Sequence, residues 1–266
     1  MSIDLAAEWL RSARKIVVFT GAGMSAESGI STFRDQEGLW QHFRPEEFGT
    51  WTGLTRMFLA HPERAADFLY ALLEPIAGAK PNAGHLAIAA LERHARVTVV
   101  TQNIDNLHQE AGSTLVHEVH GSLFEIVTQD GRFVRCVSRQ EMASIATALG
   151  RIRHGRCVLP RTLVAIRPIA GIGIHGRYRP GVVLFGDAMA EPAWGDSVDA
   201  VCHCDCLIQV GCSNAVYPAA TLPREAKAAG AKVIAVNPEK GEADVWLRGT
   251  ASDLLPKLLE AAFGSP

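Results

Sequence analysis

The sequence of 266 residues lacks the features that mark membrane, secreted and strongly charged proteins. No run of about 18 apolar residues is present, so neither a membrane-spanning helix nor a membrane partner is predicted. Residues 1–15 lack the basic-then-apolar layout of a signal peptide, which makes a cytoplasmic location the expectation. A net charge of −2 gives no sign of a nucleic-acid-binding surface.

The cysteines lack C-x-x-C spacing, the commonest arrangement of zinc and redox sites. In a reducing compartment the six thiols are not expected to form disulfides. Cys202, Cys204 and Cys206 alternate before or within an apolar run, so successive side chains would point to opposite faces of a strand. We interpret them as small buried or half-buried thiols, with a metal cluster that includes His203 as the alternative. The other cysteines are Cys136, Cys157 and Cys212.

Repeats and low-complexity linkers are also absent, and short apolar runs alternate with amphipathic segments. An apolar content of 48% supplies a sizeable core. The apolar runs are rich in β-branched residues, which favours strands covered on both faces. Strands are predicted at 15–20, 97–101, 181–186, 206–211 and 232–237, and helices at 3–14, 61–76, 83–95, 223–230 and 251–264. The alternation predicts an α/β fold with a Rossmann-like doubly wound parallel sheet.

Residues 124–180 interrupt this alternation. Asp130-Gly131 predicts a hairpin turn, and residues 138–152 have the spacing of one helix. We predict a small inserted domain at 124–180, between two strands of a main domain formed by 1–123 and 181–266.

Gly21 and Gly23 directly follow the first predicted strand, with Ala26 three residues later. This pattern at a strand-to-helix turn is typical of a phosphate-binding loop, because missing side chains let the backbone approach a pyrophosphate. A tight turn without a ligand is the alternative. The next strand ends on Gln102 and Asn103 rather than on the acidic residue of a dehydrogenase.

Three polar side chains, Gln102, Asn103 and Asp105, follow the strand at 97–101. Asn103 or Asp105 could cap the next helix, or these groups could face a ligand that both donates and accepts hydrogen bonds.

Six motifs occur in an order that resembles the sirtuins, the NAD-dependent protein deacylases. They are "GAGMSAESGISTFRD", "TQNIDNLHQEAG", "HEVHGSL", "RPGVVLFGD", "VGCSNAVYPAA" and "VNPE", and the resemblance spans about residues 10–262. It implies an NAD-binding main domain and an enzyme that transfers an acyl group from lysine to ADP-ribose, with release of nicotinamide.

The resemblance also implies the NAD-binding residues. The phosphate loop and the segment that closes over it would supply Gly21, Ala22, Gly23, Ser25, Phe33, Arg34 and Asp35, although plain core packing is the alternative for Phe33 and for Trp40. Nicotinamide and its ribose would meet Gln102, Asn103, Ile104 and Asp105. The adenosine side would meet Gly211, Cys212, Ser213, Asn237, Glu239 and Ala251, with Cys212 in the middle of the family's "GTS" turn.

His120 matches the family's catalytic histidine, and we name it with Asn103 as catalytic. A histidine suits a base that activates a ribose hydroxyl, because its pKa lies near neutrality. His117 and His108 are interpreted as bystanders.

An acyl-lysine protein or peptide is the implied substrate. Its backbone would pair with Val182, Val183, Phe185 and Gly186 by strand addition, and its acyl-lysine stem would pass Val216 and Tyr217. Leu69 and Leu72 occupy the places of a Tyr-x-x-Arg pair that binds anionic acyl groups in some sirtuins. Two aliphatic side chains offer no charge-assisted bond, so neutral acyl groups are predicted. A monomer is compatible with the sequence.

The four zinc cysteines of most sirtuins are replaced here by Thr128, Gly131, Gly171 and Ile174. We therefore expect no zinc. A substitute site from Cys136, Cys157, His154 and His175 is the alternative to an insert held by apolar packing. That packing would use Ile145, Leu149, Val158, Leu163, Val164, Ile166, Ile169 and Ile172.

Two other functions fit part of the pattern. A mono-ADP-ribosyltransferase or NAD hydrolase shares cleavage of the nicotinamide bond. A non-catalytic NAD-binding regulator would not need Asn103 and His120.

Overall fold

The computed structural model describes residues 2–32, 38–153, 155–174 and 176–264. The chain divides into two compact units, residues 1–28, 80–120 and 189–266 in the first, and 29–79 and 121–188 in the second. The insert expected at 124–180 is therefore only part of the second unit. Residues 29–79 belong with it because α5 (Pro62–Gly78) packs against α8 (Arg139–Ile152) and α9 (Val158–Ile166).

The first unit contains a six-stranded parallel sheet in the order β10-β9-β8-β1-β2-β3. Four of its strands agree with the sequence prediction to within one residue at each end. Its strands are β1 (Lys15–Thr20), β2 (Arg96–Thr101), β3 (Val116–Glu118), β8 (Cys206–Val210), β9 (Lys232–Val236) and β10 (Val245–Leu247).

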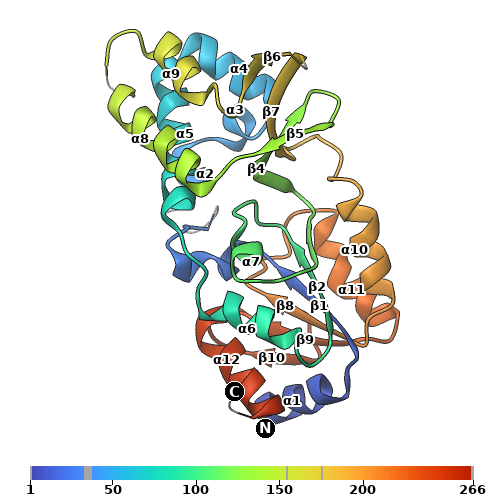
Figure 1. The fold of residues 1–266 in the computed structure, drawn as a ribbon. Helices are drawn as coiled ribbons and strands as arrows, with labels where there is room; N and C mark the ends of the chain where they lie inside the picture. Colours follow the sequence, from blue (N-terminus) through green and yellow to red (C-terminus); the bar gives the residue numbers. More distant parts are fainter. Residues whose placement is uncertain (1, 33–37, 154, 175, 265–266) are drawn as a thin grey trace. The chain divides into compact units, whose positions relative to one another are not determined.

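Helices cover both faces of this sheet, as the apolar strands predict (Figure 1). Ile16 and Val18 pack with α1 (Ser2–Ser12), α6 (Ala83–Leu91) and α12 (Ala251–Phe263). Val17 and Phe19 face the other way, toward α10 (Ala193–Cys202) and α11 (Leu222–Ala228). The helix predicted at 251–264 is α12, and its N-cap is Thr250. Cys202 is exposed at the end of α10, so its interpretation as a buried or half-buried thiol is wrong.

The second unit contains a four-stranded antiparallel sheet in the order β5-β4-β7-β6. The predicted hairpin at Asp130-Gly131 is confirmed, with Gly131 at φ 82°. The strands are β4 (Gly121–Thr128), β5 (Phe133–Cys136), β6 (Gly171–Gly173) and β7 (Gly176–Val182). The helices are α2 (Leu39–His42), α3 (Pro45–Phe48), α4 (Trp51–Ala60), α5, α8 and α9.

The prediction of a strand of the main sheet at 181–186 is wrong both in its length and in the sheet to which the strand belongs. Only Gly181 and Val182 are in a strand, and they end β7 of the antiparallel sheet. An apolar run indicates burial but does not say which sheet a strand joins. Gly186, at φ 92°, lies beyond the strand in a turn.

The apolar packing predicted within residues 124–180 is confirmed in part. Side chains on one face of α8 and α9 are buried, together with Ile169; they are Ile145, Leu149, Val158 and Ile166. Leu163 and Val164 of α9 and Ile172 of β6 are instead exposed, so their assignment to the core is wrong. The buried face of α9 repeats every four residues, which turns Leu163 and Val164 to its opposite face.

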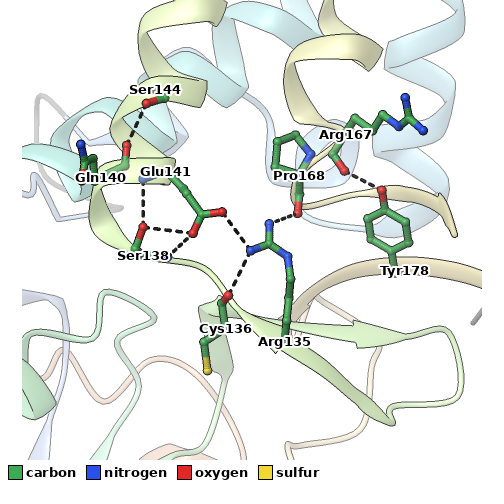
Figure 2. Close-up of polar contacts among 9 residues, drawn as sticks. All are labelled: Arg135, Cys136, Ser138, Gln140, Glu141, Ser144, Arg167, Pro168 and Tyr178. Carbon is green, nitrogen blue, oxygen red and sulfur yellow. Dashed lines mark hydrogen bonds and ion pairs between the residues drawn. The ribbon is translucent and has the colours of Figure 1, made fainter.

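An arginine-centred network adds to this packing (Figure 2). The Arg135 guanidinium donates to Glu141 Oε1 at 2.9 Å, to the Cys136 carbonyl at 3.1 Å and to the Pro168 carbonyl at 2.7 Å. Glu141 also belongs to a capping box with Ser138 at the start of α8. One side chain therefore joins β5, α8 and the segment after α9.

None of the helices among the described residues is long and apolar enough to cross a membrane. Within the same residues no group of three or more His, Cys, Asp or Glu side chains could hold a metal ion. Cys136 and Cys157 are exposed thiols, while His154 and His175 of the alternative zinc site lie outside the described residues. The absence of zinc stays a prediction.

Candidate active site

The predicted NAD-binding segments of the first unit meet at the carboxyl edge of the parallel sheet. Residues 21–25 follow β1, 102–105 follow β2, 211–213 follow β8, and Asn237 follows β9. β1 has β2 on one side and β8 on the other, so the chain order reverses there. Ligands of open α/β sheets bind at such a switch point, and the sequence predicted these segments as one site.

The glycine loop packs tightly against the turn after β8. Gly23 N–H donates to the Gly211 carbonyl at 3.0 Å, and Gly21 N–H donates to the Val210 carbonyl at 3.0 Å. A Cβ at Gly21 would lie 2.8 Å from Gly211 O, and a Cβ at Gly23 would lie 2.8 Å from Gly211 Cα. The close contact between the two backbone turns therefore requires glycine at both positions, whether or not a phosphate is bound.

Asn103 and Asp105 are fixed by a buried hydrogen-bond network around Ser25. Asn103 Nδ2 donates to the Gly21 carbonyl at 3.0 Å and to Ser25 Oγ at 3.1 Å, and Ser25 donates to Asp105 Oδ2 at 2.6 Å. Asp105 Oδ1 also accepts from the N–H of Leu107, the first residue of α7 (Leu107–Glu110), at 3.1 Å, although the N-cap of that helix is Asn106. The Asn103 side chain makes these bonds through nitrogen, which leaves Oδ1 as an acceptor for a ligand.

His120 lies just beyond β3, and its Nδ1 is 3.1 Å from the Gln102 carbonyl oxygen. A carbonyl only accepts, so Nδ1 carries the proton and Nε2 keeps its lone pair. Burial lowers the pKa of His120, and the hydrogen bond to Gln102 partly offsets that effect. The imidazole is therefore neutral at pH 7 with one nitrogen available as a base.

A second buried polar chain lies behind Asn103, and the sequence analysis missed it. Asn103 N–H donates to Thr101 Oγ1 at 3.0 Å, Thr20 Oγ1 lies 2.8 Å from Thr101 Oγ1, and His108 Nε2 lies 3.0 Å from Thr20 Oγ1. The centre of the His108 ring lies 4.8 Å from that of His85, and the two rings are tilted by 58°. The sequence feature that could have indicated this chain is a threonine at the last position of each of two strands, β1 and β2. In the sheet, Thr20 pairs with Thr101. His108 is therefore not a bystander in structural terms.

Complementary tautomers explain this histidine pair. His85 Nδ1 accepts from Asn82 N–H at 3.3 Å, so its Nε2 carries the proton. If His108 Nε2–H donates to Thr20, its Nδ1 is an acceptor. Both remaining nitrogens, His85 Nε2 and His108 Nδ1, are buried without a hydrogen-bond partner within normal distance. One is a donor and the other an acceptor, and a proton added to either ring would place a charge at a buried site.

Stability should therefore fall when these rings are forced to take up protons. Burial lowers the pKa of His85 to about 4; burial and the charge of His85 lower that of His108 to about 3. In the unfolded chain both titrate near 6.5, so their full contribution is present above pH 6.5 and is lost as pH falls toward 4. We expect a loss of roughly 2 kcal/mol per histidine at pH 5, measured by urea unfolding from pH 7.5 to 5.

His108→Asn should make that pH dependence shallower, because one titrating group is removed. The matched control is His203→Asn, which removes an exposed histidine. An unchanged slope in His108→Asn would contradict the assignment.

The other predicted residues of the adenosine side differ in exposure. Asn237 Nδ2 donates to the Cys212 carbonyl at 3.2 Å and so holds the turn after β8. Cys212 is buried and burial raises the pKa of its thiol, which keeps it uncharged. Ala251 is buried in the core at the start of α12. Ser213 and Glu239 are exposed. Of the residues predicted for the other parts of NAD, Ala22 in the glycine loop and Ile104 in the nicotinamide segment are half-buried.

Val216 is half-buried, whereas Tyr217 is exposed and lines a hollow of about 600 Å³ with Asn214, Arg224 and Lys227. Their predicted place along an acyl-lysine channel stays a prediction. Phe33, Arg34 and Asp35 lie outside the described residues.

The remaining substrate-binding candidates belong to the second unit. Phe185 N–H donates to the Gly49 carbonyl at 2.8 Å, and the Phe185 ring lies 6.1 Å from that of Trp40. Val182 is buried, while Val183 is half-buried and Gly186 exposed. Leu69 and Leu72, one helical turn apart on α5, pack against a core of Phe48, Met57, Ala65 and Phe68. Trp40 packs on the same core, which agrees with core packing, the alternative given for it above.

Comparisons with known proteins agree with the motif order. A family model described as the Sir2 family matches residues 21–218. An NAD-dependent protein deacylase of Desulfosudis oleivorans is 40% identical over 268 residues, 97% of this chain and 95% of that protein. An NAD-dependent protein deacylase of Mycobacterium tuberculosis is 40% identical over 252 residues, 92% of this chain and 97% of that protein.

Solved structures give the same result. A structure from work on the mechanism and regulation of Sir2 enzymes is 37% identical with a TM-score of 0.76, covering 98% of this chain and 97% of its own. Sir2Af2 bound to a myristoylated histone peptide is 33% identical with a TM-score of 0.70, covering 98% of this chain and 96% of its own. A Sir2 homologue in complex with NAD is 29% identical with a TM-score of 0.75, covering 97% of this chain and 93% of its own. The resemblance to sirtuins is thereby confirmed, and this chain belongs to the Sir2 family.

Proposed function

We infer that the chain is an NAD-dependent protein-lysine deacylase, as its curated relatives are named. The observation that carries this inference is the arrangement at the carboxyl edge of the parallel sheet. Asn103 and Asp105 are held rigidly through Ser25, and a neutral His120 lies beside Gln102 with a free ring nitrogen.

These residues fit NAD by the chemistry of their donors and acceptors. NAD supplies a ribose whose bond to nicotinamide can be broken. Asn103 offers a fixed amide carbonyl toward that ribose, and Asp105 orders the segment through Ser25 and Leu107. His120 accepts a proton at Nε2 while Nδ1–H remains bonded to the Gln102 carbonyl. The resulting cation is stabilised by that bond, which is the property a general base needs.

The test is incubation of an acetyl-lysine peptide with NAD, followed by mass spectrometry. Free lysine, nicotinamide and O-acetyl-ADP-ribose in equal amounts are expected. ADP-ribosylated protein would indicate a transferase, and ADP-ribose without peptide turnover would indicate an NAD hydrolase. No NAD consumption with any acyl peptide would leave a regulatory NAD-binding protein.

The acyl preference is predicted to be for neutral groups, from acetyl to longer aliphatic chains. Leu69 and Leu72 pack on an aliphatic and aromatic core, and neither side chain offers a cation to a succinyl or malonyl carboxylate. We expect succinyl-peptide turnover to be lower than acetyl-peptide turnover by about 100-fold, the cost of a charge without a partner. Leu69→Tyr with Leu72→Arg should narrow that ratio, whereas Leu59→Arg, at an exposed position of α4, should not. A panel of acyl peptides measures the ratio of acetyl-peptide to succinyl-peptide turnover in each variant.

The second unit is proposed to hold together without zinc. Thr128 and Gly171, two of the replaced cysteine positions, both pair with Tyr178 in the sheet, and Tyr178 donates to the Arg167 carbonyl at 2.5 Å. Arg135 joins β5, α8 and Pro168. Metal analysis is expected to find no stoichiometric zinc, and a chelator should leave the melting temperature unchanged.

Arg135→Met should lower stability by about 1–3 kcal/mol, because two carbonyls and Glu141 lose a charged donor. Arg132→Met is the control, since the Arg132 side chain is paired with an exposed carboxylate, that of Asp130. One zinc per chain, or equal losses in the two variants, would contradict this account.

A further inference from the structure

The second unit carries a segment whose charge differs sharply from that of the whole chain. Residues 142–186 contain seven arginines and no aspartate, glutamate or lysine, although the chain as a whole has a net charge of −2. Arg151, Arg156, Arg161, Arg167 and Arg177 are exposed. No ion pair joins any of these five to an acidic residue in the described part of the chain. By contrast, Arg153 is paired with Asp67.

Four aliphatic side chains are exposed among these arginines. Leu163 and Val164 of α9 are 52% and 73% exposed, Ile172 of β6 is 75% exposed, and Ile174 beyond it is 96% exposed. Soluble surfaces carry single exposed aliphatic residues commonly, but four within twelve residues, in a segment rich in arginines without ion pairs, are more than isolated exposure.

The two parts of this patch are physically joined. Tyr178 of β7 donates to the Arg167 carbonyl at the end of α9, and Ile172 pairs with Arg177 across the β6–β7 hairpin. Arg135 holds the Pro168 carbonyl that follows α9. Figure 1 draws α9, β6 and β7 at the same end of the second unit, and Figure 2 shows the side chain of Arg167 pointing away from Tyr178.

From these observations we propose that this surface docks on an anionic lipid membrane. It is defined by Arg151, Arg156, Arg161, Arg167 and Arg177 with Leu163, Val164, Ile172 and Ile174, and is called here the arginine–aliphatic surface. Charge complementarity selects an anionic partner, because no acidic side chain of residues 142–186 balances the arginines.

The aliphatic side chains distinguish a membrane from other anions. Ile174, beside the β6–β7 turn, is almost fully exposed, and lipids can surround such a side chain without a matching cavity. Single-stranded nucleic acid stacks on exposed aromatic rings. The large apolar side chains of the arginine–aliphatic surface are all aliphatic. Basic residues beside an amphipathic helix are the usual signature of anionic lipid recognition. The expectation of no membrane partner rested on the lack of a spanning segment, which a peripheral surface does not need.

The test is co-sedimentation of the full chain, without NAD, with vesicles of phosphatidylglycerol and phosphatidylcholine, at two salt concentrations. Binding to anionic vesicles that weakens with salt is expected, with little binding to phosphatidylcholine alone. Arg161→Gln, Arg167→Gln and Arg177→Gln together should weaken binding by about 100-fold, since each arginine near an anionic surface contributes about fivefold.

The matched control is Arg93→Gln, Arg96→Gln and Arg248→Gln, which removes three exposed arginines of the first unit and the same charge. Ile172→Ser with Ile174→Ser should weaken binding by about tenfold or more, and Leu86→Ser, at an exposed site on α6, should not. Circular dichroism of each variant reports folding.

No binding to anionic vesicles would overturn the proposal. Equal losses of vesicle affinity in the two triple-arginine variants would also overturn it, and so would vesicle binding that is unchanged by Ile172→Ser with Ile174→Ser. Tight binding of a duplex oligonucleotide or of an acidic peptide, without vesicle binding, would assign the surface to that class of partner instead. Because vesicle binding is measured without NAD or acyl peptide, its outcome is independent of the deacylase assay.

Discussion

Replacement of His120 by alanine is expected to lower deacylation of an acetyl-lysine peptide by about 10²–10⁴-fold while NAD binding is retained. A positioned base contributes about that factor. His120 contacts the first unit through one hydrogen bond, from Nδ1 to the Gln102 carbonyl at 3.1 Å, so its loss should leave the buried Asn103–Ser25–Asp105 network intact. Product formation is measured by mass spectrometry and NAD binding by calorimetry.

His117→Ala is the matched control, because His117 is another half-buried histidine three residues earlier, on β3. It should keep most of the activity. Burial lowers the pKa of His120 below its ordinary value, so the acid limb of kcat/KM should have its midpoint below 6.5. Unchanged turnover in His120→Ala would remove the histidine from the proposed mechanism.

Gly211→Ala is expected to abolish NAD binding and to lower stability by about 3 kcal/mol or more. Gly211 has φ 59°, which costs alanine about 1–2 kcal/mol. Its Cβ would also lie 2.4 Å from the Gly23 carbonyl carbon and from Met24 N, a backbone overlap that forces the glycine loop away. Thermal unfolding and NAD titration measure the two effects.

Gly230→Ala separates strain from overlap. Gly230 also has a positive φ, 96°, but a Cβ there would meet nothing within 4 Å. It should lose only the 1–2 kcal/mol of conformational cost and keep NAD binding. Equal losses in the two variants would mean that the tight contact between the loops after β1 and β8 is unimportant.

Much of the first unit followed from sequence patterns. Continuous β-branched runs predicted buried parallel strands, and the carboxyl ends of those strands had to lie at one edge of the sheet. The resemblance to sirtuins assigned residues 21–25, 102–105 and 211–213 to one NAD site, and these segments follow β1, β2 and β8 of the parallel sheet. Helix ends followed less closely from the sequence: the helix predicted at 3–14 is α1, which spans Ser2–Ser12.

The second unit was harder to predict, since its pairing joins segments far apart in the chain. Apolar content suggested that residues 181–186 belong to the main sheet, whereas β7 pairs with β4 and ends at Val182. The packing of α5 against α8 moved residues 29–79 into this unit, and no local pattern in either helix encodes that choice.

The amino-acid sequence by itself determined the family and the parallel sheet and supplied the candidate residues for the chemistry, because ordered motifs and strand ends are local in the chain. Tertiary structure alone decided which of those residues are held rigidly. It brought Thr20, Thr101, His108 and His85 together behind Asn103. It also left Val164, Ile172 and Ile174 exposed beside unpaired arginines, since burial depends on which faces of α9 and β6 find a partner, and hydropathy does not specify that.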